Sequence, residues 1–289
     1  MQTEQKELNV VISALNEEKY IGLLLDSLVK QTNKDFDVTV VDGQSEDKTV
    51  EVAKTYNDKL DLKVIVCPKR GLGTQRSYGA RLGKADKILF LDSDVILHPR
   101  FVEDLLNGLK SKDLDLVNCW LIPLSKKRVD KIMYNLYNIF FLEFSRYVWP
   151  VGIGNSLLVK RSVFEKVGDF GNMVWEDVDY VQRAINAGAK YGVLRKPKVY
   201  ASVRRFEMQG RMNYIRENFK ILRYAIRHKQ MPDRKSGLYP LGIDYNQLDL
   251  KNSRENEARL KRLAERYRVY LAKIKETADK FDLKEFIER

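Results

Sequence analysis

The first third of the chain alternates short, largely apolar runs with segments whose apolar residues recur every three or four positions. A continuous apolar run is typical of a β-strand buried on both faces, and the second pattern is typical of an amphipathic helix. The usual product of such a series is a parallel sheet with helices on both faces. We expect strands at Leu8–Ala14, Asp37–Val41, Leu62–Cys67 and Lys87–Leu91, and helices after an N-cap at Asn16, at Glu46–Tyr56 and at Thr74–Leu82.

Sheets of this kind bind their ligands beyond the carboxyl ends of the strands. The residues that directly follow the expected strands are Asn16 and Glu17, Asp42 and Gly43, Pro68 to Gly73, and Asp92, Ser93 and Asp94. Several of them are acidic, and carboxylates that gather at one edge are costly unless a cation or hydrogen-bond donors neutralise them. The sequence therefore predicts a site at this edge that contains positive charge.

Asp92 and Asp94 are separated by one residue at the end of an apolar strand. Mg²⁺ and Mn²⁺ prefer such oxygen ligands and complete their shells with waters and substrate phosphates. An Asp-x-Asp alone also fits a solvated turn, but the preceding strand and the other acids at the strand ends favour a metal. We expect no histidine ligand, because His98 lies in a turn before a proline and His228 lies in a basic helical segment.

Five segments, taken together in this order, resemble the inverting GT-A glycosyltransferases of family 2. They are VVISALNEEKYIGLLLDSL, VVDGQSEDKTVEVA, LFLDSDV, GNSLLVKRSVFEKVGDF and WEDVDYVQRAINAGAK. The resemblance covers about residues 8–206. It implies an α/β fold of the GT-A (Rossmann-like) type, a mostly parallel sheet with helices on both faces, and a C-terminal helical extension. It also implies a catalytic domain at 1–206 and a basic, mainly helical extension at 207–289.

The resemblance further implies a donor site for a nucleotide-diphosphate sugar of the UDP or GDP type and a Mg²⁺ or Mn²⁺ cofactor. Its donor-binding residues would be Leu15, Asn16, Glu17, Asp42, Arg76, Asp92, Ser93, Arg204 and Arg205. In the family pattern, Asp42 would hydrogen-bond the base and Arg76 would reach the ribose or the diphosphate. Asp94 would bind mainly the metal, and Asp92 the ribose or the metal.

The acidic pair Glu176 and Asp177 matches the family's acceptor site, with Asp177 as the expected general base. Sugar transfer builds negative charge on the leaving diphosphate, which a metal and cationic side chains stabilise. A carboxylate on the opposite face takes the proton of the acceptor hydroxyl, so one displacement inverts the anomeric carbon. The pair also suits the N-terminal end of a helix. Trp175, just before it, is either an acceptor platform or a core residue.

Two departures from the family pattern bear on function. The segment after the second strand reads Asp42-Gly43-Gln44-Ser45, where relatives often have Asp-Asp-Gly-Ser. The Gln-x-x-Arg-Trp signature of processive synthases is absent, so we expect transfer of a single sugar. We find no signal-peptide pattern and no run of about 18 apolar residues. We therefore expect a cytoplasmic protein, with peripheral attachment to the inner face of the cell membrane as an open alternative.

Most of the positive charge lies in the last third of the chain. Residues 201–289 hold 22 of the 52 Lys+Arg and 13 of the 40 Asp+Glu, which is +9 of the net +12. Such a surplus indicates an anionic partner. A nucleic-acid-binding protein is one alternative function, but the segment has no recognisable reading motif, and we expect no nucleic-acid partner. A catalytically inactive GT-A scaffold is another, and the joint presence of Asp42, Asp94 and Asp177 opposes it.

The spacing of apolar and basic residues at 208–229 predicts one helix, on which an apolar stripe and a basic stripe lie side by side. The apolar stripe is Met212, Ile215, Phe219, Leu222 and Ile226, and the basic stripe is Arg216, Lys220, Arg223 and Arg227. Either the apolar stripe packs on the catalytic domain, or the helix lies on an anionic membrane surface.

Two further segments bear on partners. An aromatic stripe is either part of a core helix or a wall for a glycan or lipid-linked acceptor; it comprises Met133, Tyr137, Phe140, Phe144 and Tyr147. A charged helix is expected at 253–276, after a linker at 232–240, with a narrow apolar seam that begins at Leu260. That seam suits either packing on 208–229 or a homodimer. Finally, Cys67 and Cys119 lie in apolar stretches, where we expect buried, reduced thiols.

Overall fold

The computed structural model describes residues 5–147, 149–228 and 230–233. The helix expected at 253–276 and most of the linker expected at 232–240 lie outside these residues. Residue contacts divide the chain into a first unit, Met1–Leu241, and a second, Gly242–Arg289. All described residues belong to the first unit. Among them, no helix has both the length and the apolar composition needed to cross a bilayer.

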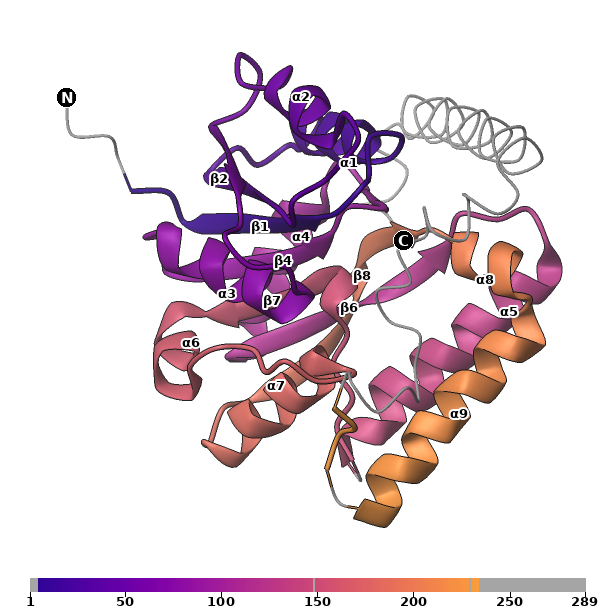
Figure 1. Ribbon diagram of the computed structural model, residues 1–289. Helices are drawn as coiled ribbons and strands as arrows, with labels where there is room; N and C mark the ends of the chain where they lie inside the picture. The colour runs from indigo at the N-terminus through magenta and orange to yellow at the C-terminus, as the bar shows by residue number, and fades with distance from the viewer. Residues whose placement is uncertain (1–4, 148, 229, 234–289) are drawn as a thin grey trace, which may run out of the picture. The chain divides into compact units, whose positions relative to one another are not determined.

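One sheet forms the centre of the first unit (Figure 1). Its strands are β1 (Leu8–Ala14), β2 (Phe36–Asp42), β3 (Leu62–Val66), β4 (Lys87–Asp92), β5 (Val95–Leu97), β6 (Leu116–Pro123), β7 (Leu157–Lys160) and β8 (Tyr191–Ala201). Their order across the sheet is β3-β2-β1-β4-β7-β6-β8-β5. Strands β1 to β4 pair in parallel, as does β6 with β8, whereas β7 runs antiparallel to β4 and β6, and β5 runs antiparallel to β8. The parallel pairing predicted for the first four strands is therefore confirmed, and the later strands make the sheet mixed.

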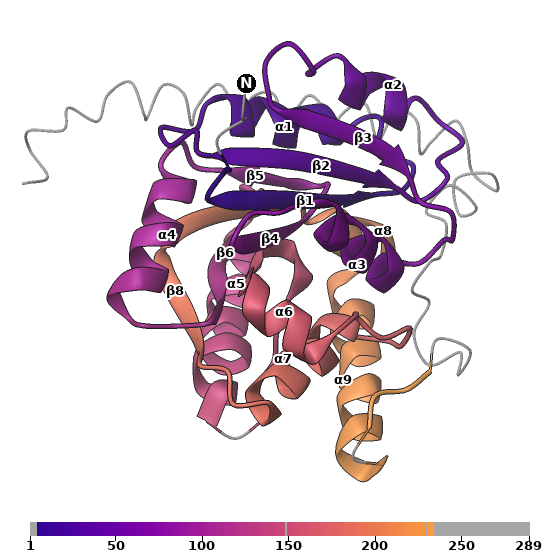
Figure 2. The same cartoon turned by 90° about the vertical axis from the view of Figure 1, so that its left-hand side faces the viewer.

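Helices cover both faces of the sheet (Figure 2). They are α1 (Ile21–Val29), α2 (Thr49–Lys54), α3 (Leu72–Leu82), α4 (Phe101–Ser111), α5 (Arg128–Tyr137), α6 (Arg161–Val167), α7 (Glu176–Asn186), α8 (Arg204–Gln209) and α9 (Arg211–His228). A π-helix, η1 (Asn138–Phe144), continues α5, and short 3-10 turns follow at η2 (Ser145–Tyr147) and η3 (Gly154–Ser156).

Alternate residues along each buried strand face opposite layers of the core. In β1, Val10 and Ile12 pack with residues of α1 and α4, and Val11 packs with residues of α3, α6 and α7. Because both faces are covered, the strand is buried along its whole length and mostly apolar, with only Asn9 and Ser13 polar. Cys67 and Cys119 are both buried and free, as predicted.

Several expected element boundaries are wrong. Asn16 is not an N-cap, because α1 begins only at Ile21, after Tyr20. The helix expected at Glu46–Tyr56 is shorter, and the one expected at 208–229 is two helices, α8 and α9. The two meet at Gly210, whose φ of 82° is a conformation that glycine adopts without strain.

For the apolar stripe of 208–229 and for the aromatic stripe, the sequence left open whether the residues are packed inside the protein or exposed to a partner. Both stripes are largely exposed. On α9, Ile215, Phe219 and Ile226 are 45%, 65% and 66% exposed, so the expectation that this stripe packs on the catalytic domain is wrong for these residues. The buried residues of α9 are Ile221 and Ala225 instead. The aromatic stripe is split, since Met133 and Tyr137 are half-buried whereas Phe140, Phe144 and Tyr147 are exposed. The side chain of Met212 lies outside the described part of the structure.

Candidate active site

The strand pairing brings the expected site residues to one edge of the sheet. Ala14, the last residue of β1, pairs with Asp42, the last residue of β2. Ser13 pairs with Asp92, the last residue of β4. The segments that follow these three strands therefore leave the sheet side by side, as the sequence predicts.

Strand β8 delivers a cation to the same edge. Ala201 pairs with Val95, so the chain that leaves β8 lies next to Asp94. Arg204, in the first turn of α8, places its Nε 3.1 Å from Asp94 Oδ2. Its Nη1 donates to Glu17 Oε2 at 2.8 Å, and its Nη2 pairs with Glu17 Oε1. One guanidinium thus joins the segments after β1, β4 and β8. We call Glu17, Asp94 and Arg204 the rim cluster.

Burial shapes the charges of the rim cluster. Burial raises the pKa of Glu17 to about 7, and Asp94 and Asp92 add to this effect while Arg204 opposes it. Burial lowers the pKa of Arg204, but the carboxylates of Glu17 and Asp94 outweigh it and hold that pKa well above its usual range. The guanidinium also lies 4.9 Å from the centre of the Tyr20 ring. Arg204 therefore remains a cation and supports a buried acid.

A second arginine, Arg76 of α3, joins the donor and acceptor sides of the expected site. Its Nη2 donates to Asp92 Oδ1 at 2.9 Å, and its Nη1 donates to Glu176 Oε1 at 2.7 Å. Its side chain is 2% exposed. Burial opposes its charge, but Asp92 and Glu176 outweigh burial and raise its pKa. We call Arg76, Asp92 and Glu176 the inner cluster.

Gly154 makes room for the inner cluster. A Cβ at this position would lie 1.7 Å from Arg76 Nη2, closer than any side chain tolerates. The backbone of Gly154 also donates from its N–H to Asp177 Oδ2 at 2.7 Å. The same glycine therefore admits the arginine and orients the expected base.

Asp177 is half-buried in the first turn of α7, whereas Glu176 is 3% exposed. Asp177 Oδ1 accepts a hydrogen bond from Val178 N at 2.9 Å. Burial and the charge of Glu176 raise its pKa to about 6, against the opposing charge of Arg76. Glu176 is ion-paired with Arg76, whereas the carboxylate of Asp177 accepts hydrogen bonds from the backbone N–H groups of Gly154 and Val178.

Trp175 precedes the acidic pair in a left-handed conformation, with φ 56° and ψ 50°. Such a conformation is uncommon for a bulky residue and is maintained only by its surroundings. The ring is half-buried and packs with Val174 and with Ile221 of α9. Val174 N also donates to Pro232 O at 3.0 Å. The segment before α7 is thus held by α9 and by the chain that follows it.

The loop after β2 hydrogen-bonds to Asp42, at the end of β2, and to Asn16, which follows β1. Asp42 is buried, and its Oδ2 accepts a hydrogen bond from Ser45 N at 2.9 Å, while its Oδ1 accepts one from the Ser45 hydroxyl. The Ser45 hydroxyl oxygen accepts a hydrogen bond from Asn16 N at 2.8 Å. Asn16 adopts φ 57°, and its Oδ1 accepts a hydrogen bond from Glu46 N at 2.8 Å. These bonds fasten the segments after β1 and β2 together.

The remaining expected residues surround these clusters. Ser93 is buried between the two acids, Leu15 is half-buried after β1, and Arg205 is half-buried on α8. The structure joins Glu17, Asp94 and Arg204 in one cluster and Arg76, Asp92 and Glu176 in the other. The side chain of Asp42 bonds to its own loop instead.

Sequence reasoning missed two residues that position the site. Gln75 is buried and donates from Nε2 to Ala14 O and Val41 O, both at 2.8 Å, which fixes the ends of β1 and β2. Gly154 is the other. The glycines at 152 and 154 are the available signal in the sequence, but they do not reveal that one of them faces an arginine.

The two carboxylates after β4 fit a divalent cation. Among the described residues, one oxygen of each is engaged, Asp92 Oδ1 by Arg76 and Asp94 Oδ2 by Arg204. The other oxygens are hard ligands of the kind that Mg²⁺ and Mn²⁺ prefer. Within the described ranges, no group of three or more His, Cys, Asp or Glu side chains is placed to hold a metal. The protein would therefore supply two ligands, and the rest would come from phosphate oxygens and water.

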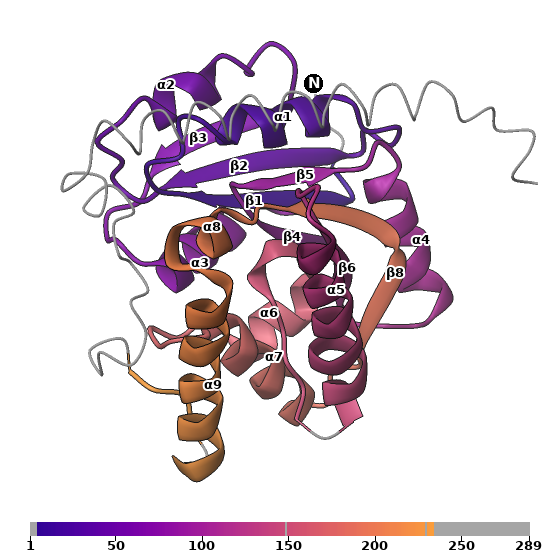
Figure 3. The ribbon, with the colours of Figure 1, turned by 90° about the vertical axis from the view of Figure 1, so that its right-hand side faces the viewer.

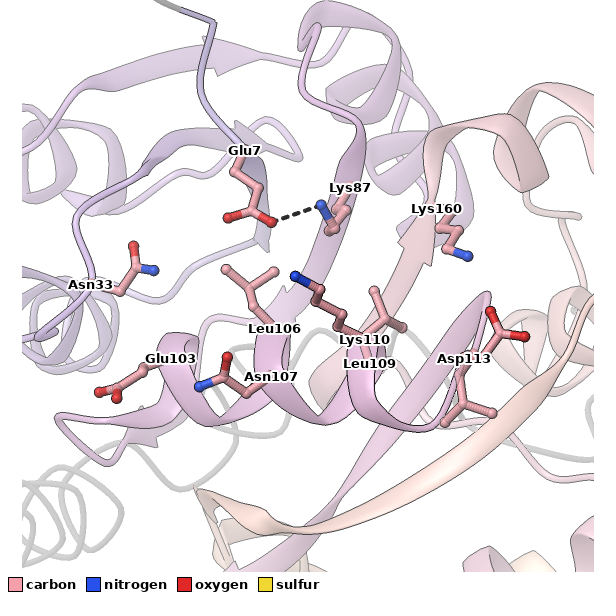
Figure 4. A pocket seen from close by; sticks show the side chains of 11 residues that line it. Glu7, Asn33, Lys87, Glu103, Leu106, Asn107, Leu109, Lys110, Asp113 and Lys160 are labelled. Atoms are coloured by element: carbon pink, nitrogen blue, oxygen red, sulfur yellow. Dashed lines mark hydrogen bonds and ion pairs between the residues drawn. The ribbon is translucent and has the colours of Figure 1, made fainter.

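A cavity of about 560 Å³ lies at the opposite edge of the sheet (Figure 4). Its wall includes Lys87, the first residue of β4, whose Nζ lies 2.8 Å from Glu7 Oε1. Lys110 and Lys160 also line it. Since it lies at the amino ends of the strands, it is separate from the two clusters.

Comparisons with known proteins agree with this geometry. The family described as "Glycosyl transferase family 2" matches residues 9–168. Poly(ribitol-phosphate) β-N-acetylglucosaminyltransferase TarP of Staphylococcus aureus (strain N315) is 30% identical over 116 residues, which cover 39% of this chain and 36% of TarP. Validoxylamine A glucosyltransferase of Streptomyces hygroscopicus subsp. limoneus is 35% identical over 103 residues, 34% of this chain and 23% of the relative. The chain thus matches only about a third or less of the length of these relatives.

Solved structures support the predicted GT-A fold. Residues 1-349 of Staphylococcus aureus TarS in complex with UDP-GlcNAc are 23% identical with a TM-score of 0.56, over 68% of this chain and 58% of that one. The mannosyltransferase PcManGT from Pyrobaculum calidifontis, in complex with GDP-Man and Mn²⁺, is 21% identical with a TM-score of 0.62, over 80% of this chain and 67% of that one. The match to the family model covers more than half of the chain and contains β1 to β4 with the acids that follow them, and the protein therefore belongs to glycosyl transferase family 2.

Proposed function

We propose that this protein is a metal-dependent inverting glycosyltransferase that moves one sugar from a nucleotide-diphosphate sugar to an acceptor. The observation that carries the proposal is the bridge made by Arg76 between Asp92, on the expected donor side, and Glu176, on the expected acceptor side. With Glu176 held by Arg76, Asp177 would be the carboxylate that meets the acceptor. We assign the catalytic domain to residues 1–206 and the extension to 207–289.

The donor would lie across the carboxyl edge of the sheet. Leu15, Asn16 and Glu17 lie where the nucleoside is expected, and Asp42 stabilises the loop beside it. Ser93 lies between the two metal ligands. The two solved relatives hold UDP-GlcNAc in one case and GDP-Man in the other, so both nucleotide types are candidates here.

Asp94 and Asp92 would hold Mg²⁺ or Mn²⁺ through the oxygens that the arginines leave available. When bound, the cation neutralises the charge that develops on the diphosphate. Arg204, already charged and 3.1 Å from Asp94, would add a second positive charge at the same place, with Arg205 beside it on α8. Positive charge at this place stabilises the charge that develops on a leaving diphosphate.

Asp177 would act as the general base. Its pKa of about 6 lets it be ionised at neutral pH and still take a proton readily. In the transfer step, the acceptor oxygen forms a bond to the anomeric carbon as the bond from that carbon to the diphosphate oxygen breaks. The electron pair of the broken bond leaves with the diphosphate, and the acceptor proton goes to Asp177. A single displacement of this kind inverts the anomeric carbon.

The acceptor would offer a hydroxyl or a phosphate oxygen near Trp175. The ring packs with Val174 and Ile221, so its orientation is set by α9 as well as by α7. A glycan, free or lipid-linked, is the class of acceptor that we propose, since aromatic rings stack on sugar faces.

The test pairs a substitution of the base with a control on the same helix. In Asp177→Asn, we expect transfer to fall by about 10²- to 10⁴-fold while donor binding persists, because only the proton acceptor is lost. Asp179→Asn is the control, since Asp179 binds Arg183 at 2.8 Å and does not touch the inner cluster. Thermal shifts with UDP, GDP and their sugars plus Mn²⁺ would identify the donor and report its binding. Full transfer activity in Asp177→Asn would disprove the base assignment.

A further inference from the structure

The outer surface of α5, η1 and η2 carries a row of large, exposed apolar side chains. Ile132, Leu136, Phe140, Phe144 and Tyr147 follow at spacings of four, four, four and three residues, so they lie on one side of the helix. Their exposed fractions are 58%, 48%, 57%, 62% and 74%. We call these five residues the outer face. An exposed row of large apolar side chains indicates a surface that binds something.

The opposite side of the same segment anchors it to the protein. Asn138 and Leu142 are buried, and the side-chain oxygen and nitrogen of Asn138 bond to the backbone of Leu121 in β6 at 3.0 and 2.8 Å. The outer face is therefore presented outward by a fixed helix. The segment already buries its other side, so the exposure of the outer face does not come from a helix that is detached from the core.

The charges around the outer face are positive. Lys126, Lys127, Arg128 and Lys131 are all exposed at the start of α5. The acids of this segment are engaged elsewhere, since Asp130 pairs with Arg211 and Glu143 pairs with Arg195. The charge presented beside the apolar row is thus that of lysine and arginine.

Helix α9 runs roughly parallel to α5 at some separation and repeats this combination (Figure 3). Its exposed apolar residues, with Phe219 at 65%, alternate with exposed cations. These cations are Arg216, Lys220, Arg223 and Arg227. The two helices are joined at their first turns, where Arg211 binds Asp130 through two hydrogen bonds of 2.6 and 2.8 Å. The ring of Phe206 contacts both Tyr134 of α5 and Tyr214 of α9.

We propose that α5–η1 and α9 dock this protein on the surface of an anionic phospholipid bilayer. Phenylalanine side chains would enter the boundary between headgroups and acyl chains, and the lysines and arginines would meet lipid phosphates. Interfaces between protein subunits are depleted in lysine, whereas basic residues mixed with exposed aromatic residues are typical of helices that lie on membranes. The proposal does not depend on the transfer reaction.

The experiment measures sedimentation of the full chain with vesicles. We expect binding to vesicles of phosphatidylglycerol mixed with phosphatidylcholine, weaker binding to phosphatidylcholine alone, and loss of binding as salt rises. Phe140→Ser combined with Phe144→Ser should weaken vesicle binding by about tenfold or more, because two aromatic rings that would be buried in the bilayer are removed. Lys127→Gln combined with Lys131→Gln should weaken it less and reduce the dependence on salt.

Val66→Ser is the matched control, since Val66 is 53% exposed on the edge strand β3, away from both helices. It should bind vesicles like the unchanged chain. The substituted residues are exposed, so thermal unfolding midpoints and donor binding should stay unchanged in every variant. Failure of the unchanged chain to bind anionic vesicles at low salt overturns the proposal. So does a double-phenylalanine variant that binds fully, or one that changes the oligomeric state by light scattering, which would make the outer face a contact between copies.

Discussion

The two arginine clusters face the same sheet edge, but their surroundings differ. Arg76 of the inner cluster comes from the middle of the chain's Rossmann-like half, is 2% exposed and lies against Gly154 with no space to move. Arg204 of the rim cluster comes from the first turn of a short helix and is 11% exposed. Arg76 pairs with Asp92, and Arg204 pairs with Asp94. A fixed cation can define the geometry of a site, whereas a cation at the rim can exchange its partners when a ligand arrives.

Replacing Arg76 should have the largest effect. In Arg76→Met, the buried carboxylate of Glu176 and the half-buried carboxylate of Asp92 lose their partner, and a broken buried ion pair costs about 3–5 kcal/mol. We expect a lower free energy of unfolding by that amount in urea titrations, together with loss of transfer. Arg76→Lys should recover part of the stability and little of the activity, because a lysine cannot serve both carboxylates with the same geometry. An unchanged free energy of unfolding in Arg76→Met would show that the inner cluster does not stabilise the fold.

Gly154→Ala should be next. The added Cβ would lie 1.7 Å from Arg76 Nη2 and must displace the guanidinium or the backbone. Overpacking of this kind costs about 1–3 kcal/mol. The activity should fall more than the stability does, since the same backbone N–H orients Asp177. Gly168→Ala is a useful contrast, because nothing lies within 4 Å of a Cβ there, although its φ of 83° adds strain. Equal activity in the two variants would argue against a special role for Gly154.

Arg204→Gln should cost less stability than Arg76→Met, about 1–3 kcal/mol, because Asp94 is partly open to water and Glu17, whose pKa is about 7, can take up a proton when its partner is lost. Its informative result is metal binding. With Arg204 removed from Asp94, Mn²⁺ alone should bind more tightly, as followed by electron paramagnetic resonance of free Mn²⁺. The KM for the donor should rise at the same time, because a cation for the diphosphate is lost. If Mn²⁺ binds no better, the rim arginine does not compete with the metal.

The smallest effect is a shift of the pH profile. Transfer should fall as pH drops through about 6, because a protonated Asp177 cannot accept the acceptor's proton. Glu176→Gln removes a negative charge that raises the pKa of Asp177, so the acid limb of kcat/KM should move to lower pH. Glu165→Gln on α6 serves as a control. A limb that does not move would indicate that another group titrates.

The sequence predicts the parallel half of the fold closely and the remainder poorly, for a physical reason. Strand β1 is buried on both faces, so its mostly apolar run, Leu8–Ala14, coincides with the strand itself. The partners of β7 and β8 depend on contacts far along the chain, which no local pattern records. On α9, the stripe of Ile215 and Phe219 has the spacing of a buried face, yet the helix is turned so that Ile221 is buried instead.

The site follows the same rule. Residues placed directly by a strand end, such as Asp92 and Asp94, could be predicted from position alone. The bridge from Arg76 to Glu176 joins residues 100 positions apart, and the need for glycine at Gly154 arises only once that bridge exists. Asn16 has the composition of a helix cap but binds the neighbouring loop, because α1 begins several residues later.

The shared guanidinium of Arg76 has a thermodynamic consequence. If a bound donor displaces Asp92, the ion pair between Arg76 and Glu176 must change as well. Glu176 lies next to the expected base, so the surroundings of the base would change before any acceptor is present. Linkage requires the reverse as well: an acceptor that disturbs Glu176 must change the affinity for the donor by the same factor. Two substrates that never touch the same side chain would then report on each other's occupancy through one buried cation.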